Sequence, residues 1–230
     1  MINGKKILAI TLARGGSTKI KKKNIVDICG KPLLQYTTDE VKKSKYIDKY
    51  IISTDYLEIA NICDELDVRY FLRNENNATN TAKSSDALIE VVASIDAEYD
   101  YILEIMCTNP LKTVEDIDGC IEKLHNTDAD SVVSVVRIWD NHPSRVKYIE
   151  NDELMDFYPE VLESRRQDLT PPAYVRNGSI YATSVSRLIA SGVRLSGIVR
   201  PYIMLEDRTI NIDEPIDLEM AKAIIKNVRT

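Results

Sequence analysis

The sequence predicts a single α/β domain with a mostly parallel, Rossmann-like sheet that carries helices on both faces. Short apolar runs rich in β-branched residues alternate with amphipathic stretches of helical length. The apolar runs hardly alternate with polar residues, which is typical of strands buried on both faces of a parallel sheet. The length of 230 residues allows one substantial domain. We therefore assign residues 1–230 to a single domain.

Up to residue 136 the chain repeats the order strand, helix, strand. Strands are expected at residues 6–12, 50–53, 68–71, 101–105 and 131–136. Helices are expected at residues 32–43, 57–65, 84–94 and 114–124. Pro32 suits a first helical turn, because the amide hydrogen that proline lacks has no partner there. The order of the strands within the sheet does not follow from this pattern.

The alternation breaks at residues 137–175. This segment contains Trp139, four prolines, mixed charge and little periodicity. We interpret it as an excursion from the sheet that forms a lid, a hairpin or an oligomerisation arm. The α/β pattern then resumes. The later strands are expected at residues 179–182 and 198–204, and the later helices at residues 184–190 and 215–226.

Composition argues against several classes of protein. The net charge of −6 disfavours a nucleic-acid-binding surface over the whole chain. The four cysteines form no CxxC pair and there are two histidines, so neither a zinc site nor a disulfide framework is expected. The first apolar run is too short for a signal peptide, and no window approaches the roughly 18 apolar residues of a membrane span. We expect a cytoplasmic protein that binds neither nucleic acid nor membrane.

The first candidate site is the loop at residues 13–24, directly after the first expected strand. It begins with Ala-Arg-Gly-Gly-Ser and ends with Lys-Asn, and residues 14–23 hold five basic side chains and no acidic one. In open α/β sheets, ligands bind beyond the carboxyl ends of the strands. Glycines let backbone amides approach an anion there, and Arg and Lys supply charge. The loop matches neither the P-loop nor the GxGxxG pattern. It is either a polyphosphate-binding loop or a solvated basic loop.

Three further places carry polar side chains that suit a ligand. Asn211 and Asp213 share one face of an extended segment, so their oxygens suit Mg²⁺, or Asp213 caps the helix expected at residue 215. Segments 163–169 and 174–181 hold paired arginines, amides and tyrosines that suit a carboxylate-bearing substrate, or they are surface charges and a turn. At residues 52–55 a strand ends in small polar side chains. These side chains either line a site or begin the next helix.

Together and in this order, these motifs resemble those of the cytidylyltransferases that activate nine-carbon sugar acids. These are the CMP-acylneuraminate synthetases and their CMP-legionaminate and CMP-pseudaminate relatives. Beside the loop at residues 13–24, the resemblance rests on Gly30-Lys31-Pro32-Leu33, Ser53-Thr54-Asp55, Leu72-Arg73, Thr108-Asn109-Pro110-Leu111, Arg166-Gln167, Asn177-Gly178-Ser179-Ile180-Tyr181 and Ile212-Asp213. It runs along essentially the whole chain. It implies a sheet of the nucleotidyltransferase type, with residues 137–175 as a protruding dimerisation extension.

The resemblance also implies roles for individual residues. Catalysis would depend on Arg14, Lys23 and Asp213, with Asp213 binding Mg²⁺ and Asn211 helping it. The nucleotide would be bound by Ala13, Arg14, Gly15, Gly16, Ser17, Lys23, Asn24, Arg73, Ala82 and Ser84. The sugar acid would be bound by Met106, Arg166, Gln167, Asn177 and Tyr181. From the extension, Arg145 or Lys147 would reach the active site of a neighbouring subunit.

The expected reaction transfers CMP from CTP to a nine-carbon 2-keto-3-deoxy sugar acid and releases pyrophosphate. The acceptor would be N-acetylneuraminate or a legionaminate- or pseudaminate-like acid. Mg²⁺ would be the cofactor, the protein a homodimer, and the product a precursor of cell-surface polysaccharide. Two alternatives stay open, namely a CMP-Kdo-type synthetase and a catalytically weak nucleotide-binding homologue. Two departures permit the second, because Met106 and Asn211 stand where many family members have a glutamine and an aspartate.

Overall fold

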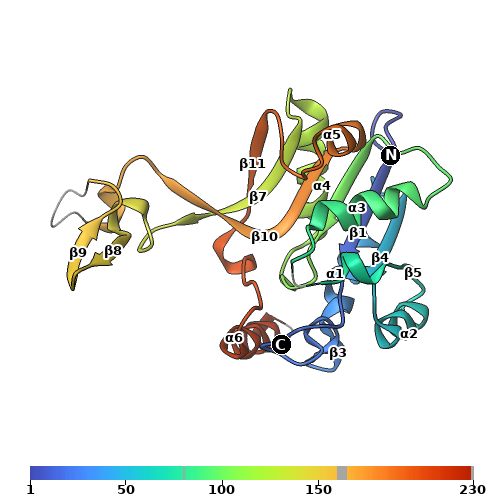
Figure 1. Ribbon diagram of the computed structural model, residues 1–230, viewed down its shortest axis with the longest axis horizontal. Coiled ribbons are helices and arrows are strands. Elements are labelled where there is room, and N and C mark those ends of the chain that lie inside the picture. The colour runs from blue at the N-terminus through green and yellow to red at the C-terminus, as the bar shows by residue number, and fades with distance from the viewer. Residues whose placement is uncertain (80, 160–164, 229–230) are drawn as a thin grey trace.

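A sheet of seven strands forms the centre of the computed structural model, which describes residues 1–79, 81–159 and 165–228 (Figure 1). The strand order is β11-β7-β10-β6-β1-β4-β5. The strands are β1 (Ile7–Leu12), β4 (Lys49–Thr54), β5 (Arg69–Leu72), β6 (Tyr101–Ile105), β7 (Ser131–Ile138), β10 (Ala173–Ser184) and β11 (Val199–Ile203). Among the described strands of this sheet, only β10 runs antiparallel to its neighbours, which are β6 and β7. The predicted mostly parallel sheet is confirmed.

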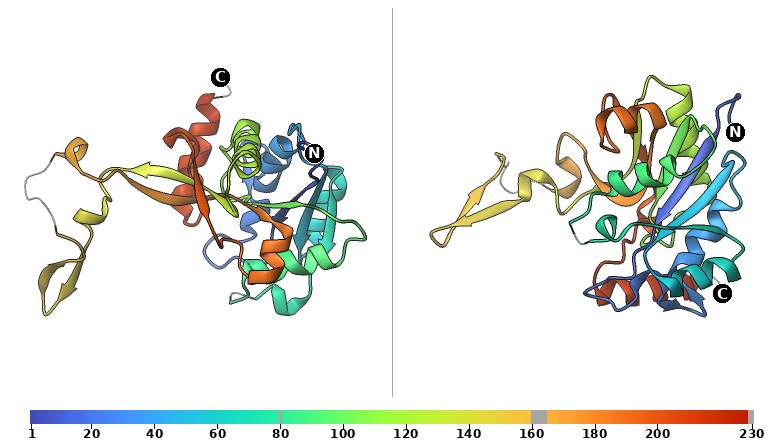
Figure 2. Two further views of the ribbon diagram at one scale, coloured as in Figure 1. Left: turned by 90° about the horizontal axis from the view of Figure 1, so that it is seen from above. Right: turned by 45° about the vertical axis from the view of Figure 1, so that its right-hand side comes forward.

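Helices cover both faces of the sheet (Figures 1 and 2). They are α1 (Leu33–Val41), α2 (Leu57–Glu65), α3 (Ser84–Ala93), α4 (Val114–Asn126), α5 (Val185–Ser191) and α6 (Pro215–Val228). Successive side chains of β1 point to opposite faces. Ile7 therefore packs in one buried cluster with Ile117 of α4, and Leu8 packs in another with Leu88 of α3 and Leu188 of α5. The helices expected from the sequence all form.

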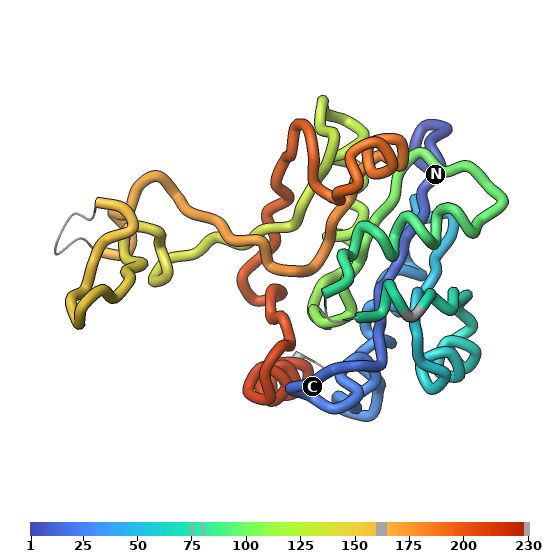
Figure 3. The backbone as a smooth tube through the Cα atoms, viewed as in Figure 1, coloured from blue at the N-terminus to red at the C-terminus, as the bar shows by residue number. Residues whose placement is uncertain are grey.

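A short hairpin joins the phosphate-loop candidate to α1. Its strands are β2 (Asp27–Ile28) and β3 (Lys31–Pro32), so Pro32 precedes the helix instead of opening it. The turn between them has positive φ at Cys29 and Gly30, which suits a two-residue hairpin. Helix α6 packs beside this hairpin, and Figure 3 shows the loop after β1 lying next to α6, although the two are nearly 200 residues apart in the chain.

The segment at residues 137–175 leaves the body of the molecule as an arm (Figures 1 and 2). The outer halves of β7 and β10 pair along it, and a second hairpin of β8 (Lys147–Glu150) and β9 (Glu153–Asp156) lies at its far end. Strand β10 begins at Ala173 instead of near residue 179. Residues 174–176 are exposed, so no buried apolar run marks this first part in the sequence. Residues 160–164, which include part of the segment at 163–169, lie outside the described residues.

No helix in the described part of the chain is long and apolar enough to cross a membrane.

Candidate active site

A cleft of about 620 Å³ opens at the carboxyl ends of β1 and β6. Parallel strands place ligand sites at this edge. The sequence-predicted residues that line it are Arg14, Ser17, Lys23, Asn24, Arg73, Ala82, Ser84, Met106, Asn211 and Asp213. The tertiary structure thus brings the loop at residues 13–24, the segment at 174–181 and the Asn211–Asp213 pair to one cleft.

The loop after β1 is fixed by contacts to its backbone. The amide of Gly15 donates to Asp55 Oδ1 at 2.9 Å, which gives the Ser53-Thr54-Asp55 motif a structural use. A Cβ at Gly15 would lie 2.6 Å from the Tyr56 ring, so glycine is required there. The buried Asn24 side chain donates to the Arg14 carbonyl at 2.8 Å and closes the loop. Asn24 therefore shapes the loop from beneath, while Arg14, Lys19 and Lys23 line the cleft.

Cations and anions face each other across the opening of the cleft. Lys23 Nζ donates to Asp213 Oδ1 at 2.8 Å and to the Ile212 carbonyl at 2.9 Å. Lys19 pairs with Glu214, and this contact raises the pKa of Lys19, so its side chain stays cationic. Arg14 Nη1 donates to the Thr79 carbonyl at 3.2 Å from the opposite wall. Several positive side chains thus converge on one cleft, as polyphosphate binding requires.

Arg73 extends beneath the cleft and is 9% exposed. Its guanidinium donates to the carbonyls of Ser53 and Asn77, and burial lowers the pKa of Arg73. Its Nε is buried and has no hydrogen-bond partner within the described residues. A buried donor that lacks a partner is uncommon in native proteins. The position of Arg73 beside Ala82 and Ser84, where α3 begins, therefore suits a bound ligand.

Asn211 and Asp213 lie side by side at one end of the cleft. Asn211 Nδ2 donates to Asp213 Oδ2 at 2.6 Å, and Thr108 Oγ1 donates to Asn211 Oδ1 at 2.7 Å. The amides of Asp213 and Glu214 donate to Asp217 in the first turn of α6, while the Asp213 carboxylate itself bonds with Asn211 and Lys23. No cluster of three acidic, His or Cys side chains occurs among the described residues. Mg²⁺ does not need one, because one carboxylate plus substrate phosphates can hold it. Asp213 and Asn211 offer the carboxylate and amide oxygens that this ion takes as ligands.

A second cleft of about 310 Å³ adjoins the first, since Gly178 and Asn211 line both. Asn177 and Tyr181 line it, as does Arg194. The Arg194 guanidinium lies 3.9 Å from the centre of the Tyr181 ring. Asn177 accepts from Ser134 Oγ at 2.7 Å, so its side chain is held in place. Asn177 and Tyr181, which were predicted to bind the sugar acid, therefore lie next to the first cleft.

Other predicted residues lie elsewhere. Ala13 is fully buried in the core behind the loop. Arg166 and Gln167 form a short 3-10 turn in the arm, where Arg166 lies over the Trp139 ring and pairs with Asp140 at 3.4 Å. The arm also carries Arg145 and Lys147, whose sequence position predicted a role in a neighbouring site. None of these arm residues lines either cleft.

The sequence analysis missed several charged residues near the site, among them Lys83, which lines the first cleft. Glu104 lines the first cleft and Arg194 the second, and Lys112 is buried next to the Met106 carbonyl. Glu104 had a visible signal, namely a charged residue inside the apolar run YILEI. Lys112 and Arg194 lie outside any motif that the sequence presents.

The fold and the cation-lined cleft together are typical of an α/β nucleotide-binding protein. The family model described as "Cytidylyltransferase" matches residues 8–182. The chain belongs to this cytidylyltransferase family and is a nucleotidyltransferase enzyme.

Similar proteins agree with this membership. The pseudaminic acid cytidylyltransferase of Campylobacter jejuni is 28% identical over 227 residues, covering 96% of this chain and 97% of that protein. The CMP-N,N'-diacetyllegionaminic acid synthase of Legionella pneumophila is 29% identical over 231 residues, with the same coverage of 96% and 97%. A solved CMP:2-keto-3-deoxy-manno-octonic acid synthetase in complex with CTP has a TM-score of 0.75 at 16% identity and covers 97% of this chain and 99% of its own. The last comparison shows the shared fold.

Proposed function

We propose that the protein transfers CMP from CTP to a nine-carbon 2-keto-3-deoxy sugar acid and releases pyrophosphate. The observation that carries the proposal is the adjoining pair of clefts, one lined by the basic loop and the other by Asn177 and Tyr181. A nucleotide and a polar acceptor bound there would meet near Asn211. Relatives named for pseudaminic and legionaminic acids support an acceptor of this class.

In this mechanism the protein positions the reactants and neutralises charge. Arg14 and Lys23 hold the triphosphate, so negative charge that develops on the departing pyrophosphate meets fixed cations. Arg73 orients the nucleoside from beneath the cleft. The hydroxyl at the anomeric carbon of the acceptor attacks the α-phosphorus in line, the bond to pyrophosphate breaks, and the hydroxyl proton passes to water. Asn177 and Tyr181 hold the acceptor for that attack.

Mg²⁺ is the cofactor that we propose for this reaction, held by Asp213 with Asn211 as a neutral helper. When bound, it supplies Lewis-acid stabilisation of charge on phosphate oxygens. Lys23, which contacts Asp213, keeps that carboxylate close to the phosphate loop.

We also propose that the enzyme is a homodimer formed through the arm at residues 137–175. The arm carries Arg145, Lys147, Arg166 and Gln167 away from the clefts of its own chain. If the arm reached a second copy of the chain, these residues would lie at the second cleft of that partner. A dimer therefore gives the arm side chains a role that a single chain does not.

Pyrophosphate release tests the proposal directly. The wild-type enzyme is incubated with CTP and Mg²⁺ and with sialic, legionaminic, pseudaminic or Kdo acid. We expect turnover with at least one nine-carbon acid and less with Kdo. Preference for Kdo would instead identify a CMP-Kdo-type synthetase. Binding of CTP without turnover of any acid would support the catalytically weak homologue.

A further inference from the structure

A buried carboxylate on β6 lines the first cleft beside Arg73 and Ser84, and the proposed mechanism gives it no role. Glu104 is 1% exposed, between the fully buried Leu103 and Ile105, and it lines the cleft. Its Oε2 pairs with Arg194 Nη1. Its Oε1 is buried and accepts no hydrogen bond of ordinary geometry in the part of the chain that the structure describes, although Ser84 lies near it. Burial raises the pKa of this carboxyl, and Arg194 and the Ser84 side chain oppose that rise. An unpaired buried acceptor at the edge of a cleft is a position where a ligand donor fits.

Arg194, the other member of this ion pair, lines the second cleft. Its guanidinium lies over the Tyr181 ring at 3.9 Å, and Tyr181 is paired in register with Glu104 across β10 and β6. Arg194 lines the second cleft while Glu104 lines the first. The ion pair therefore spans the junction of the two clefts, with an acceptor-only group on one side and a donor-only group on the other.

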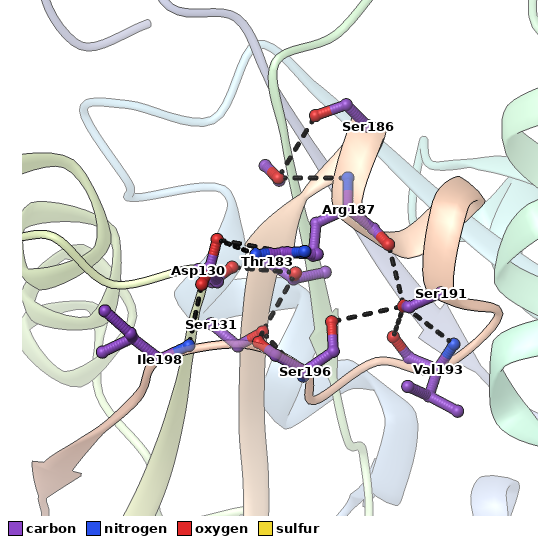
Figure 4. A network of polar contacts seen from close by, with 10 residues as sticks. Asp130, Ser131, Thr183, Ser186, Arg187, Ser191, Val193, Ser196 and Ile198 are labelled. Atoms are coloured by element: carbon purple, nitrogen blue, oxygen red, sulfur yellow. Dashed lines mark hydrogen bonds and ion pairs between the residues drawn. The ribbon is translucent and has the colours of Figure 1, made fainter.

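The loop that carries Arg194 is held rigidly at both ends (Figure 4). Ser191 Oγ accepts from the Val193 amide at 3.3 Å and donates to the Val193 carbonyl at 3.0 Å. On the other side, the Ser196 amide donates to Ser131 Oγ at 3.3 Å.

Further along, Asp130 accepts from the Ile198 amide at 2.7 Å and from Arg187 at 2.8 Å. A recognition residue needs such support, because a loosely held guanidinium loses binding energy to ordering.

Building on the function proposed above, we propose that Glu104 and Arg194 together recognise an acylamino substituent of the acceptor sugar. The amide N–H of such a group donates and its carbonyl accepts, which complements Glu104 Oε1 and the Arg194 guanidinium. A site built to hydrogen-bond a group strongly disfavours analogues that lack it, because its own polar groups are left unpaired. The pair thus acts as a specificity element for the second substrate and leaves CTP binding to the loop after β1.

The test compares acceptors that differ only at this group. N-acetylneuraminate and N,N'-diacetyllegionaminate are each paired with the analogue that has a hydroxyl in place of an acylamino group. The variant Glu104→Leu combined with Arg194→Leu removes both charges, so no lone buried charge remains. We expect the ratio of kcat/KM for the acylated acid to kcat/KM for its hydroxyl analogue to fall at least about tenfold, a larger change than any in the KM for CTP.

Matched controls separate recognition from structure. Arg200 and Asp128 form an ion pair at 2.7 Å outside both clefts, and replacing both by Leu should leave the acceptor ratio unchanged. If the Glu104/Arg194 double variant does not fold, Glu104→Gln keeps the side-chain shape. It should raise the acceptor KM severalfold without changing the KM for CTP.

The outcomes are distinguishable. An active wild type and a folded double variant with an unchanged acceptor ratio would overturn the role of the pair and leave the proposed function standing. A wild type that prefers the hydroxyl analogues would overturn the acylamino assignment. A wild type that binds CTP but turns over no sugar acid would overturn the proposed function, and the inference with it.

Discussion

At the scale of single residues, Lys23 links the two parts of the phosphate site. Its ammonium bonds with Asp213 and with the Ile212 carbonyl, 190 and 189 residues further along the chain. It is 17% exposed on its side chain, whereas Asp213 is 59% exposed. Lys23 is therefore well held and carries its charge at the place where the loop and the acidic segment meet.

Replacing Lys23 by Ala should lower kcat/KM for CTP about tenfold or more, because a charged hydrogen bond is worth about 1.5–3 kcal/mol. Steady-state kinetics with varied CTP measures the change. Lys21→Ala is the matched control, since Lys21 is exposed on the same loop and does not line the cleft. Unchanged turnover of both Lys23→Ala and Arg14→Ala would refute the phosphate-loop assignment.

Asp213→Asn should reduce activity by orders of magnitude, and extra Mg²⁺ should restore only part of it, because Mg²⁺ strongly prefers a charged oxygen. Asn211→Asp should be tolerated and lower the Mg²⁺ requirement. The measurement is the Mg²⁺ dependence of the rate together with the melting temperature. An Asp213→Asn enzyme with a normal rate and normal Mg²⁺ response would end the metal assignment.

Lys112 gives a pH dependence of stability. Its ammonium is buried and donates to Thr37 Oγ1 at 2.8 Å and to the Met106 carbonyl at 2.7 Å. Burial lowers the pKa of Lys112 from 10.5 to about 7. Between those two values the unfolded chain binds the proton and the folded chain has released it, so stability rises with pH in that range.

We expect the free energy of unfolding of the wild type, relative to Lys112→Met, to rise by about 1.4 kcal/mol per pH unit inside that window. Denaturant unfolding at several pH values measures both proteins, and the difference cancels the other titrating groups. Parallel pH profiles would show that Lys112 stays protonated in the folded state.

At the scale of elements, the hairpin of β8 and β9 exposes apolar side chains at the end of the arm. Ile149 and Leu154 are cross-strand partners and are 75% and 69% exposed. The same hairpin carries the exposed rings of Tyr148 and Phe157, whose centres are 5.1 Å apart. A small hairpin with this surface has little core of its own, and exposed apolar patches mark interaction sites.

Ile149→Glu combined with Leu154→Glu should convert the proposed dimer into a monomer, because burying the new charges opposes association. Sedimentation should give a mass near twice 26.1 kDa for the wild type and near 26.1 kDa for the variant. Leu57→Glu is the control, since Leu57 is also 69% exposed but lies on α2 in the body. A wild-type monomer with full activity would contradict the arm's proposed role.

At the scale of the whole molecule, the second cleft lies at the base of the arm, whereas the arm residues Arg145, Lys147 and Arg166 line neither cleft. Charge recognition is short-ranged in salt, over roughly 8–10 Å. The proposed role of the arm residues therefore requires that the arm meet another copy of the chain.

Mixing two impaired variants tests such a shared site. Lys23→Ala damages the body and Arg166→Ala damages the arm, so a mixed dimer would contain one site free of both changes. Activity after refolding the two variants together that exceeds the activity of either variant alone would support the shared site. Mixtures with no more activity than the separate variants would place each complete site within one chain.

Most elements were predictable because their signals are local. The buried runs at residues 50–53 and 101–105 and the amphipathic stretch at 114–124 became β4, β6 and α4 nearly residue for residue. The arm was predictable only as a break in that pattern. Its hairpin and the early start of β10 were not, because exposed strands such as residues 174–176 lack a buried face to impose a period.

The sequence by itself determined the α/β class, the basic loop at residues 14–23 and the separate polar motifs, since each depends on residues close together in the chain. Only the tertiary structure decided how they combine. Strand β10 lies antiparallel between β6 and β7, which pairs Tyr181 with Glu104 and sets Arg194 beside both. Helix α6 brings Asp213 to Lys23. The first of these contacts joins residues 77 positions apart, and the last joins residues 190 positions apart. Such contacts arise from packing of the whole chain, so no periodic pattern in the sequence marks them.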